Sequence, residues 1–213
     1  MTSHQRSSSP VTATATEAPE GRTAYAAYAA YAFDFDGTLA DTSDINHGSV
    51  QASLAAHGIT VTLDWVAAEP VFTARQLRRR LALSAAALPE ETFARAARAY
   101  WFANTDRIRP ITAASTTARA AAEHAAIAVV SANYSDIVRH GLEVVGLDDL
   151  PWTVVGRDHV AHPKPAPDAY LHAARLLGVE PGRCLAHEDT DEGVTAATAA
   201  GMHVIDIRHR PWR

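Results

Sequence analysis

The chain has 213 residues, of which 47% are hydrophobic and 20% charged, and its formal net charge is −5. This composition is typical of a globular protein, and it lacks the basic surplus expected of a nucleic-acid or anionic-membrane partner. The single cysteine, Cys184, excludes an internal disulfide, and no apolar run approaches the roughly 18 residues of a membrane span. We therefore expect a cytoplasmic protein, and a chain of this size can work as a monomer.

The start of the chain differs in composition from the rest. Residues 1–23 are rich in Ser, Thr, Ala and Pro and carry no hydrophobic periodicity, which predicts a disordered N-terminal tail. No apolar stretch of roughly 7–15 residues is present there, so a secretory signal is not expected. The apolar and aromatic residues that follow predict a buried strand at about 29–35.

A helical block follows this strand. Within residues 43–107, one helix closes at 54–58 with Gly58 as its C-cap, a second covers 73–81, and a third covers 89–101. From residue 112 onward, short apolar runs alternate with helical segments, which is typical of βαβ units and a parallel sheet. The helices predicted in this part are 112–124, 135–146, 167–178 and 191–200, and the strands are 126–132, 152–156, 183–189 and 202–207.

The order of these elements predicts an α/β fold: a Rossmann-like parallel sheet core with a helical cap inserted after the first strand. The core comprises residues 24–42 and 108–213, and the cap comprises residues 43–107.

Polar and ionisable residues follow all but the last of the predicted core strands. Because ligands bind beyond the carboxyl ends of the strands in an open parallel sheet, these residues should meet in one crevice. Clustered carboxylates repel one another and need a cation at neutral pH, and a donor set made of oxygens suggests Mg²⁺. The residues are Asp34 and Asp36 after the first strand, Ser131 and Asn133 after the second, Lys164 after the third, and Glu188 and Asp189 after the fourth.

The same groups suit phosphoryl transfer. An aspartate can attack phosphorus, a second carboxyl can move the proton, and hydroxyl and ammonium groups can hold the phosphoryl oxygens. Lys164 is the only lysine among the 19 basic residues, and a proline on each side stiffens the loop that presents it. Because Lys164 lies in a loop, we expect its replacement to remove activity and leave the fold intact.

Four segments resemble the motifs of the haloacid dehalogenase superfamily: FDFDGTLADT, VVSAN, HPKPAPDAY and HEDTDEGVTAATAAGM, in the family's order and over about residues 29–207. The last two also resemble the β-phosphoglucomutase-like and sugar phosphatase branch, whose members carry a helical cap after the first strand. The resemblance implies that Asp34 is the nucleophile, that Asp36 is the general acid/base, and that Lys164 screens charge between Asp34 and the phosphoryl group. It also implies Mg²⁺ ligands at Asp34, Asp36 through its backbone carbonyl, Asp189 and Glu188, and phosphate contacts at Thr38, Ser131 and Asn133.

The expected activity is that of a Mg²⁺-dependent phosphomonoester hydrolase that acts on a small phosphorylated metabolite, a sugar phosphate, through an aspartyl phosphate. Arg75 falls near the place where related caps hold an arginine that meets the distal end of the substrate. Two alternatives stay open at this stage. One is a phosphosugar mutase of the β-phosphoglucomutase type, and the other is a catalytically silent binding protein on the same fold.

Two further branches of the superfamily do not fit the sequence. Haloacid dehalogenases lack the second aspartate of the first motif, which is present here as Asp36. Phosphonate hydrolases use a cap lysine, and residues 41–107 contain no lysine. In β-phosphoglucomutases a cap histidine lies twelve residues after the nucleophile, and that count reaches Asn46 here, one residue before His47. Because asparagine has no ionisable group, this position favours hydrolysis over the mutase reaction.

Simpler roles compete with some of these assignments. Glu188 and Asp189 could be N-cap acids of the 191–200 helix and serve in part that way. Residues 78–80 are three arginines that we interpret as a solvated helix face. Among the histidines, only His162 and His187 lie close to the predicted site.

Overall fold

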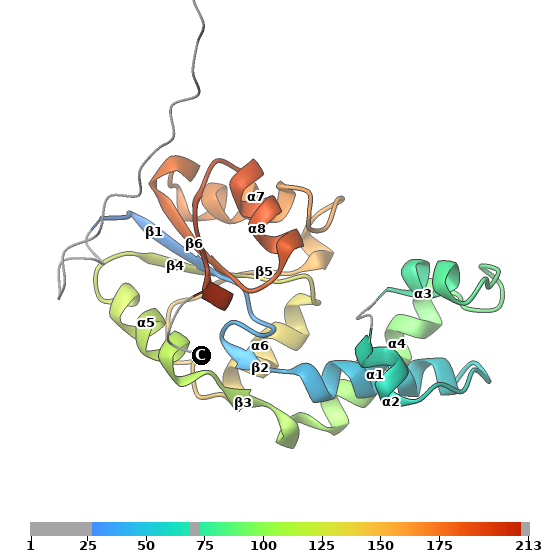
Figure 1. The fold of residues 1–213 in the computed structure, drawn as a ribbon. Helices are drawn as coiled ribbons and strands as arrows, with labels where there is room; N and C mark the ends of the chain where they lie inside the picture. The colour runs from blue at the N-terminus through green and yellow to red at the C-terminus, as the bar shows by residue number, and fades with distance from the viewer. Residues whose placement is uncertain (1–26, 69–72, 210–213) are drawn as a thin grey trace, which may run out of the picture.

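The structure is a computed structural model that describes residues 27–68 and 73–209 (Figure 1). The tail predicted for residues 1–23 lies outside these ranges. Within them, no helix combines the length and the apolar character that crossing a membrane requires.

A five-stranded parallel sheet forms the centre of the core, with strand order β5-β4-β1-β6-β7. β1 is the middle strand, and its Ala30 lies opposite Ala126 on one side and Cys184 on the other. Such a strand is buried on both faces, which explains the apolar run that precedes Asp34. The strands are β1 (Ala30–Phe33), β4 (Ala126–Val130), β5 (Thr153–Val155), β6 (Cys184–Glu188) and β7 (His203–Asp206).

Helices cover both faces of the sheet, and the alternation of β1 sets how each face packs. Tyr31 and Phe33 point to the face covered by α5 and α6, whereas Ala30 and Ala32 point to the face covered by α7 and α8 (Figure 1). The small alanines let the alanine-rich helices α7 and α8 approach closely. The core helices are α5 (Thr112–Ala122), α6 (Ser135–Val144), α7 (Asp168–Leu177) and α8 (Asp191–Ala199), with short 3₁₀ turns η2 (Thr105–Arg107), η3 (Arg157–His159), η4 (Pro181–Arg183) and η5 (Ile207–His209).

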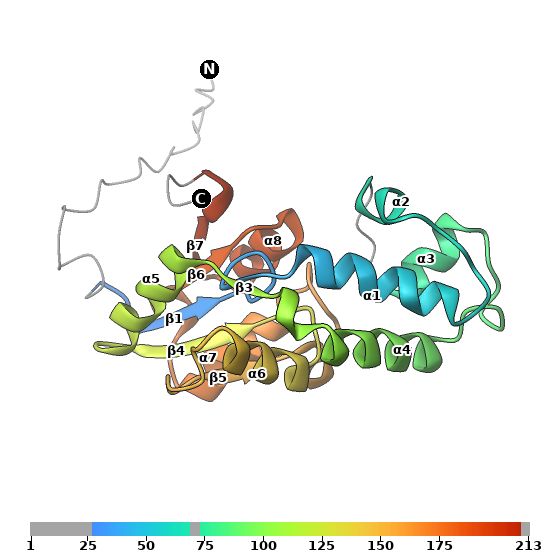
Figure 2. The same ribbon diagram turned by 90° about the horizontal axis from the view of Figure 1, so that it is seen from below.

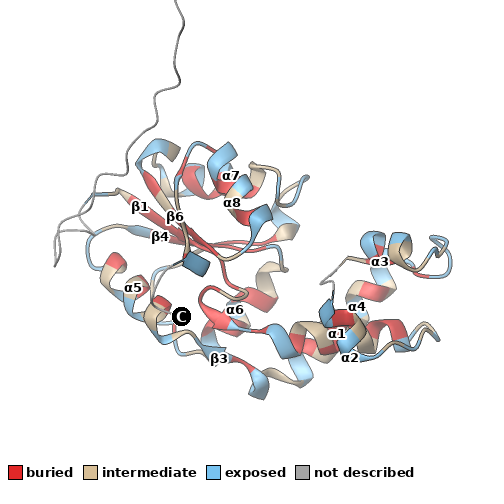
Figure 3. Cartoon of the chain, in the orientation of Figure 1, coloured by how far each residue is buried: buried red, intermediate tan, exposed pale blue. Residues whose placement is uncertain are grey.

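In the part of the chain that the structure describes, four helices over residues 43–103 form the cap, which projects to one side of the core (Figure 2). They have a hydrophobic centre of their own, which includes Leu54, Leu77, Leu88 and Phe93, and Figure 3 shows buried segments on the cap helices. The C-cap of the first helix is Ala56, and the predicted Gly58 lies two residues further on, where its φ of +73° ends the turn that follows the helix. The helices are α1 (Ser43–Ala55), α2 (Leu63–Ala68), α3 (Ala74–Arg80) and α4 (Glu90–Ala103). The predicted fold class, a parallel sheet with a helical cap after its first strand, is confirmed.

Two local features differ from the sequence interpretation. A two-stranded antiparallel ribbon, β2 (Ala40–Asp41) with β3 (Arg109–Pro110), joins the two connections between core and cap. Its strands are too short to give a period-2 pattern in the sequence.

The interpretation of residues 78–80 as a solvated helix face is wrong for Arg78 and Arg80. Arg78 donates a hydrogen bond to the Leu88 carbonyl at 2.8 Å, and Arg80 lies 3.6 Å from the centre of the Trp65 ring, so both hold the cap together.

Candidate active site

The loop after β1 presents Asp34 and Asp36. The Asp34 backbone N–H donates to the His187 carbonyl on β6, and the chain then closes a tight turn in which Gly37 donates to Ala40 at 2.8 Å. Gly37 has φ of +81°, and a Cβ there would lie 2.2 Å from Asp189 Oδ2. Only glycine therefore allows this loop to adopt its conformation and to approach the loop after β6 so closely.

Lys164 lies buried between two carboxylates. Its Nζ donates to Asp34 Oδ1 at 2.7 Å and to the Val130 carbonyl at 2.8 Å, and it also contacts the Glu188 carboxylate. The exposed fractions of the three side chains are 5% for Lys164, 8% for Asp34 and 0% for Glu188. Lys164 lies in the predicted loop, but its side chain points into the interior of the protein, where the ammonium group is buried.

Burial and charge together shift the pKa values of this cluster. Burial raises the pKa of the Asp34 carboxyl well above its usual range; Lys164 lowers it, and the neighbouring carboxylates raise it further. Burial lowers the pKa of Lys164, but the attraction of Asp34 and Glu188 outweighs it, so the net shift is upward. Lys164 is therefore a fixed cation at neutral pH.

Three groups besides Lys164 donate hydrogen bonds to the Glu188 carboxylate. The Tyr170 hydroxyl of α7 donates to its Oε1, and the Asp189 N–H and Thr190 hydroxyl donate to its Oε2 at 3.3 and 3.4 Å. A Cβ at Gly193 would lie 2.0 Å from the Glu188 carboxyl carbon, so α8 can begin this close to the carboxylate only with glycine there. Tyr170 was not among the predicted site residues, because its place on an apolar helix face gives no signal of a polar role.

Three carboxylates form an oxygen cluster suited to a cation. Oxygens of Asp34, Glu188 and Asp189 lie within 4.8 Å of one another. Thr38 is fully buried, and its hydroxyl donates to Asp189 Oδ1 at 3.4 Å. A cluster of oxygen donors from Asp and Glu fits a hard cation such as Mg²⁺ and does not fit a soft metal. Neither Glu188 nor Asp189 is the N-cap of α8. The N-cap residue is Thr190, whose hydroxyl accepts from the Gly193 N–H.

Asp36 is half-buried and accepts hydrogen bonds from three neutral side chains. Its Oδ1 accepts from the Thr42 hydroxyl at 2.7 Å and from Asn46 Nδ2 at 2.8 Å, and its Oδ2 accepts from the Ser131 hydroxyl at 3.2 Å. Thr42 and Asn46 stand at the start of cap helix α1, whereas Ser131 follows core strand β4. The carboxylate therefore lies where the cap joins the core, and the contact with Asn46 was not predicted.

The two remaining predicted site residues, Asn133 and Arg75, lie in different parts of the molecule. Ser131 also accepts from the Asn133 N–H at 3.0 Å, while the Asn133 side chain accepts from the next backbone N–H in its own turn. Arg75 is exposed on α3, which lies at the outer end of the cap, far from β1 and β6 in Figures 1 and 2. The structure thus brings Asn133 near Asp36 and does not bring Arg75 there.

Neither of the two histidines close to the predicted site belongs to the cluster. His187 is buried and stacks on Phe33, with the ring centres 4.6 Å apart, on the sheet face that packs against α5 and α6. His162 is exposed and pairs with Asp168 at 2.8 Å.

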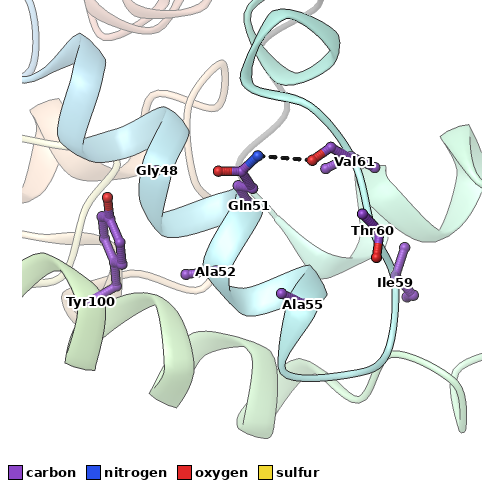
Figure 4. A pocket seen from close by; sticks show the side chains of 8 residues that line it. All are labelled: Gly48, Gln51, Ala52, Ala55, Ile59, Thr60, Val61 and Tyr100. Atoms are coloured by element: carbon purple, nitrogen blue, oxygen red, sulfur yellow. Dashed lines mark hydrogen bonds between the residues drawn. The ribbon is translucent and has the colours of Figure 1, made fainter.

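A separate hollow of about 220 Å³ lies on the cap between α1 and the chain at residues 59–61 (Figure 4). Gln51 spans its edge by donating to the Val61 carbonyl at 2.8 Å. None of its lining residues is a predicted site residue. They are Gly48, Gln51, Ala52, Ala55, Ile59, Thr60, Val61 and Tyr100.

A parallel sheet, a helical cap after its first strand, and a buried Asp–Lys–Glu cluster at the strand ends define a class of hydrolases. The family model of the haloacid dehalogenase-like hydrolases matches residues 31–207, and the chain belongs to this family. Among characterised relatives, the fructose-1-phosphate phosphatase YqaB of Escherichia coli (strain K12) is 32% identical over 189 residues, which cover 86% of this chain and 98% of that protein.

Solved structures agree on the fold. CbbY from Rhodobacter sphaeroides in complex with phosphate matches with a TM-score of 0.71 and 24% identity over 87% of this chain and 90% of its own. A hydrolase of the same superfamily from Deinococcus radiodurans R1, with bound phosphate and sodium, matches with a TM-score of 0.60 and 27% identity over 84% of this chain and 80% of its own. The prediction of an enzyme of this superfamily, made from the four motifs, is confirmed.

Proposed function

We propose that the chain is a Mg²⁺-dependent phosphomonoester hydrolase that acts on a small sugar phosphate through an aspartyl phosphate on Asp34. One observation carries the proposal. The Asp34 carboxylate is buried at the end of β1 with one oxygen on Lys164 and with Glu188 and Asp189 oxygens nearby. A buried carboxylate next to a fixed cation and further acids suits a nucleophile that receives a charged phosphoryl group.

The reaction takes two steps on this chain's residues. An Asp34 oxygen attacks phosphorus while the bond from phosphorus to the ester oxygen breaks, and the Asp36 carboxyl gives its proton to that leaving oxygen. Asp36, now a carboxylate, takes a proton from a water molecule that attacks the phosphorus. The bond between phosphorus and Asp34 breaks, phosphate leaves, and Asp36 is protonated again.

Other groups hold the phosphoryl oxygens during both steps. Lys164 keeps its positive charge beside Asp34 and offsets the charge that the phosphoryl group brings in. Asp34, Asp189, Glu188 and the backbone carbonyl of Asp36 are the groups that would hold Mg²⁺. A bound Mg²⁺ supplies positive charge that orients the phosphoryl group and stabilises the transition state.

Two facts support the choice of a hydrolase of sugar phosphates. The relative that is similar over nearly its full length is a fructose-1-phosphate phosphatase. The position twelve residues after Asp34 is Asn46, and its amide, which carries no titratable proton, contacts Asp36. The cytoplasmic location, the monomeric state and the lack of a nucleic-acid or membrane partner stay predictions from composition, as do the substrate-binding roles of Asn133 and Arg75.

Phosphate release decides the proposal. The purified chain is screened against phosphorylated metabolites with Mg²⁺, and the best substrate is then tested with the Asp34→Asn variant. We expect release by the wild type and none by Asp34→Asn. The matched control is Asp149→Asn, which changes an exposed aspartate that pairs with Arg119 and should leave the rate unchanged. Undiminished release by Asp34→Asn would refute the proposal, and glucose 6-phosphate formed from β-glucose 1-phosphate faster than free phosphate would favour the mutase.

A further inference from the structure

The side-chain amide of Asn46 has only one orientation that satisfies its neighbours. Its Nδ2 donates to Asp36 Oδ1 at 2.8 Å and to Thr42 Oγ1 at 3.1 Å, and its Oδ1 accepts from Trp101 Nε1 at 3.3 Å. An indole N–H can only donate, so the Asn46 atom that faces Trp101 Nε1 has to be the amide oxygen. The reversed amide would set its NH₂ group against the indole N–H, so Trp101 fixes which end of Asn46 meets Asp36.

Trp101 is a rigid anchor for this contact. It is 1% exposed on cap helix α4 and belongs to the same buried cluster as Phe35 and Ile45. A buried indole N–H without an acceptor would be unfavourable, so the hydrogen bond to Asn46 Oδ1 stabilises one rotamer of Asn46. A chain of hydrogen bonds therefore leads from α4 through α1 to the Asp36 carboxylate.

We infer that Asn46, oriented by Trp101, is a positioning residue that aims the Asp36 carboxyl at the leaving oxygen of the substrate. The inference rests on the proposed role of Asp36 as general acid/base. Without Asn46, Asp36 Oδ1 keeps only its bond from Thr42, and the carboxyl gains freedom to turn about its side-chain torsions. Asp34 and Lys164, which would contact the phosphoryl group, have no hydrogen bond to Asn46. Loss of Asn46 should therefore leave the attack of Asp34 on phosphorus unchanged.

This role makes the effect of Asn46 depend on the leaving group. A sugar alkoxide is a poor leaving group that needs the proton from Asp36, whereas nitrophenolate leaves without protonation. For Asn46→Ala we expect kcat/KM to fall by about 10- to 100-fold for the sugar phosphate hydrolysed best in a screen, which is part of the ~10²–10⁴-fold that general acid catalysis as a whole contributes. For p-nitrophenyl phosphate, whose first step needs no acid, we expect a loss in kcat/KM below about threefold by the same reasoning.

Three further variants test the path through Trp101. Asn46→Asp keeps the shape but sets a second carboxylate against Asp36, so its loss should exceed that of Asn46→Ala. Trp101→Phe should give a smaller loss with the same leaving-group dependence, and the double variant Asn46→Ala/Trp101→Phe should match Asn46→Ala alone. Trp65→Phe is the control, because it makes the same chemical change in the cap on α2, where Trp65 packs on Arg80. It should leave both substrates unaffected.

The possible outcomes separate the two claims. If the wild type releases no phosphate, or Asp36→Asn retains full activity, the proposed function fails. If those controls behave as expected but Asn46→Ala and Trp101→Phe keep wild-type values, the positioning role is wrong. Equal losses for both substrates, together with a lower melting temperature, would show a merely structural role and overturn it as well. Losses that multiply in the double variant would overturn the link between Trp101 and Asn46.

Discussion

Replacing Lys164 by methionine tests how the buried charges of the site are balanced. Methionine keeps a flexible apolar stem but removes the ammonium that lies between Asp34 and Glu188. The position of Lys164 in a loop predicts that the fold survives its replacement. Because the side chain is only 5% exposed, however, the substitution leaves two buried carboxylates without their cation, so we expect the fold to survive with a lower free energy of unfolding.

The size of the effect follows from burial. Breaking a buried ion pair by removing one partner destabilises a protein by about 3–5 kcal/mol. A domain of this kind has a free energy of unfolding of roughly 5–15 kcal/mol, so the variant should fold but lose a large part of its stability at neutral pH.

The loss should depend on pH in a defined direction. Burial already raises the pKa of Asp34 in the folded state, and without Lys164 that pKa rises further. The folded state then binds a proton more readily than the unfolded chain, whose Asp pKa is about 3.9. The stability that proton binding to Asp34 contributes is therefore greatest below the unfolded-state pKa of about 3.9, and it is lost as the pH rises through the raised folded-state pKa. The gap between wild type and variant should widen from acid to mildly alkaline pH, by at most about 1.4 kcal/mol per pH unit for each carboxylate.

Urea unfolding followed by tryptophan fluorescence, without Mg²⁺ and near pH 5 and pH 8, measures this difference. The control Arg119→Met removes an exposed cation that pairs with Asp149, and its effect should stay within about 1 kcal/mol at both pH values. Lys164→Arg keeps the charge, so its stability should show little of this pH dependence, while its bulkier guanidinium should restore little activity. A Lys164→Met loss that is equal at both pH values, or below about 1 kcal/mol at pH 8, would refute the reasoning.

Three other predictions follow from the same cluster. EDTA should abolish phosphate release and Mg²⁺ should restore it; Mg²⁺ should also raise the melting temperature of the wild type but not of Asp189→Asn, and equal shifts in both would contradict the metal site. Gly193→Ala should destabilise the protein by about 1–3 kcal/mol because its Cβ would meet the Glu188 carboxylate, whereas Gly182→Ala, with open space around it, should be neutral in the same urea assay. Tyr170→Phe should lower the free energy of unfolding by roughly 1.5–3 kcal/mol through loss of a charged hydrogen bond, and an unchanged urea midpoint would show that the hydroxyl does not stabilise Glu188.

The sequence predicts the frame of the site well, because strand ends in a parallel sheet leave little choice of position. Apolar runs place Asp34, Ser131 and Glu188 at or just after the carboxyl ends of neighbouring strands, and the strand order then brings them to one edge. The three carboxylate positions that make up the oxygen cluster were all predicted from these strand ends.

The supporting residues could not be found in the same way. Tyr170 and Trp101 occupy apolar helix faces, where a pattern of hydrophobic residues cannot tell a packing ring from a ring whose polar atom has a partner. Asn46 reaches Asp36 only because α1 begins directly after the β2–β3 ribbon, and two-residue strands leave no trace in periodicity. Arg80 resembles a surface charge in sequence, and only the approach of Trp65 from another helix gives it a stacking partner.

The covalent intermediate is the most direct test of the proposed reaction. The enzyme is mixed with Mg²⁺ and a substrate labelled in its phosphoryl group, quenched in acid during turnover, digested and analysed by mass spectrometry. We predict a phosphoryl group on the peptide that contains Asp34, at that side chain, and none on the same peptide of the Asp34→Asn variant. Rapid phosphate release without any label on Asp34, or with the label on a different residue, would contradict the account.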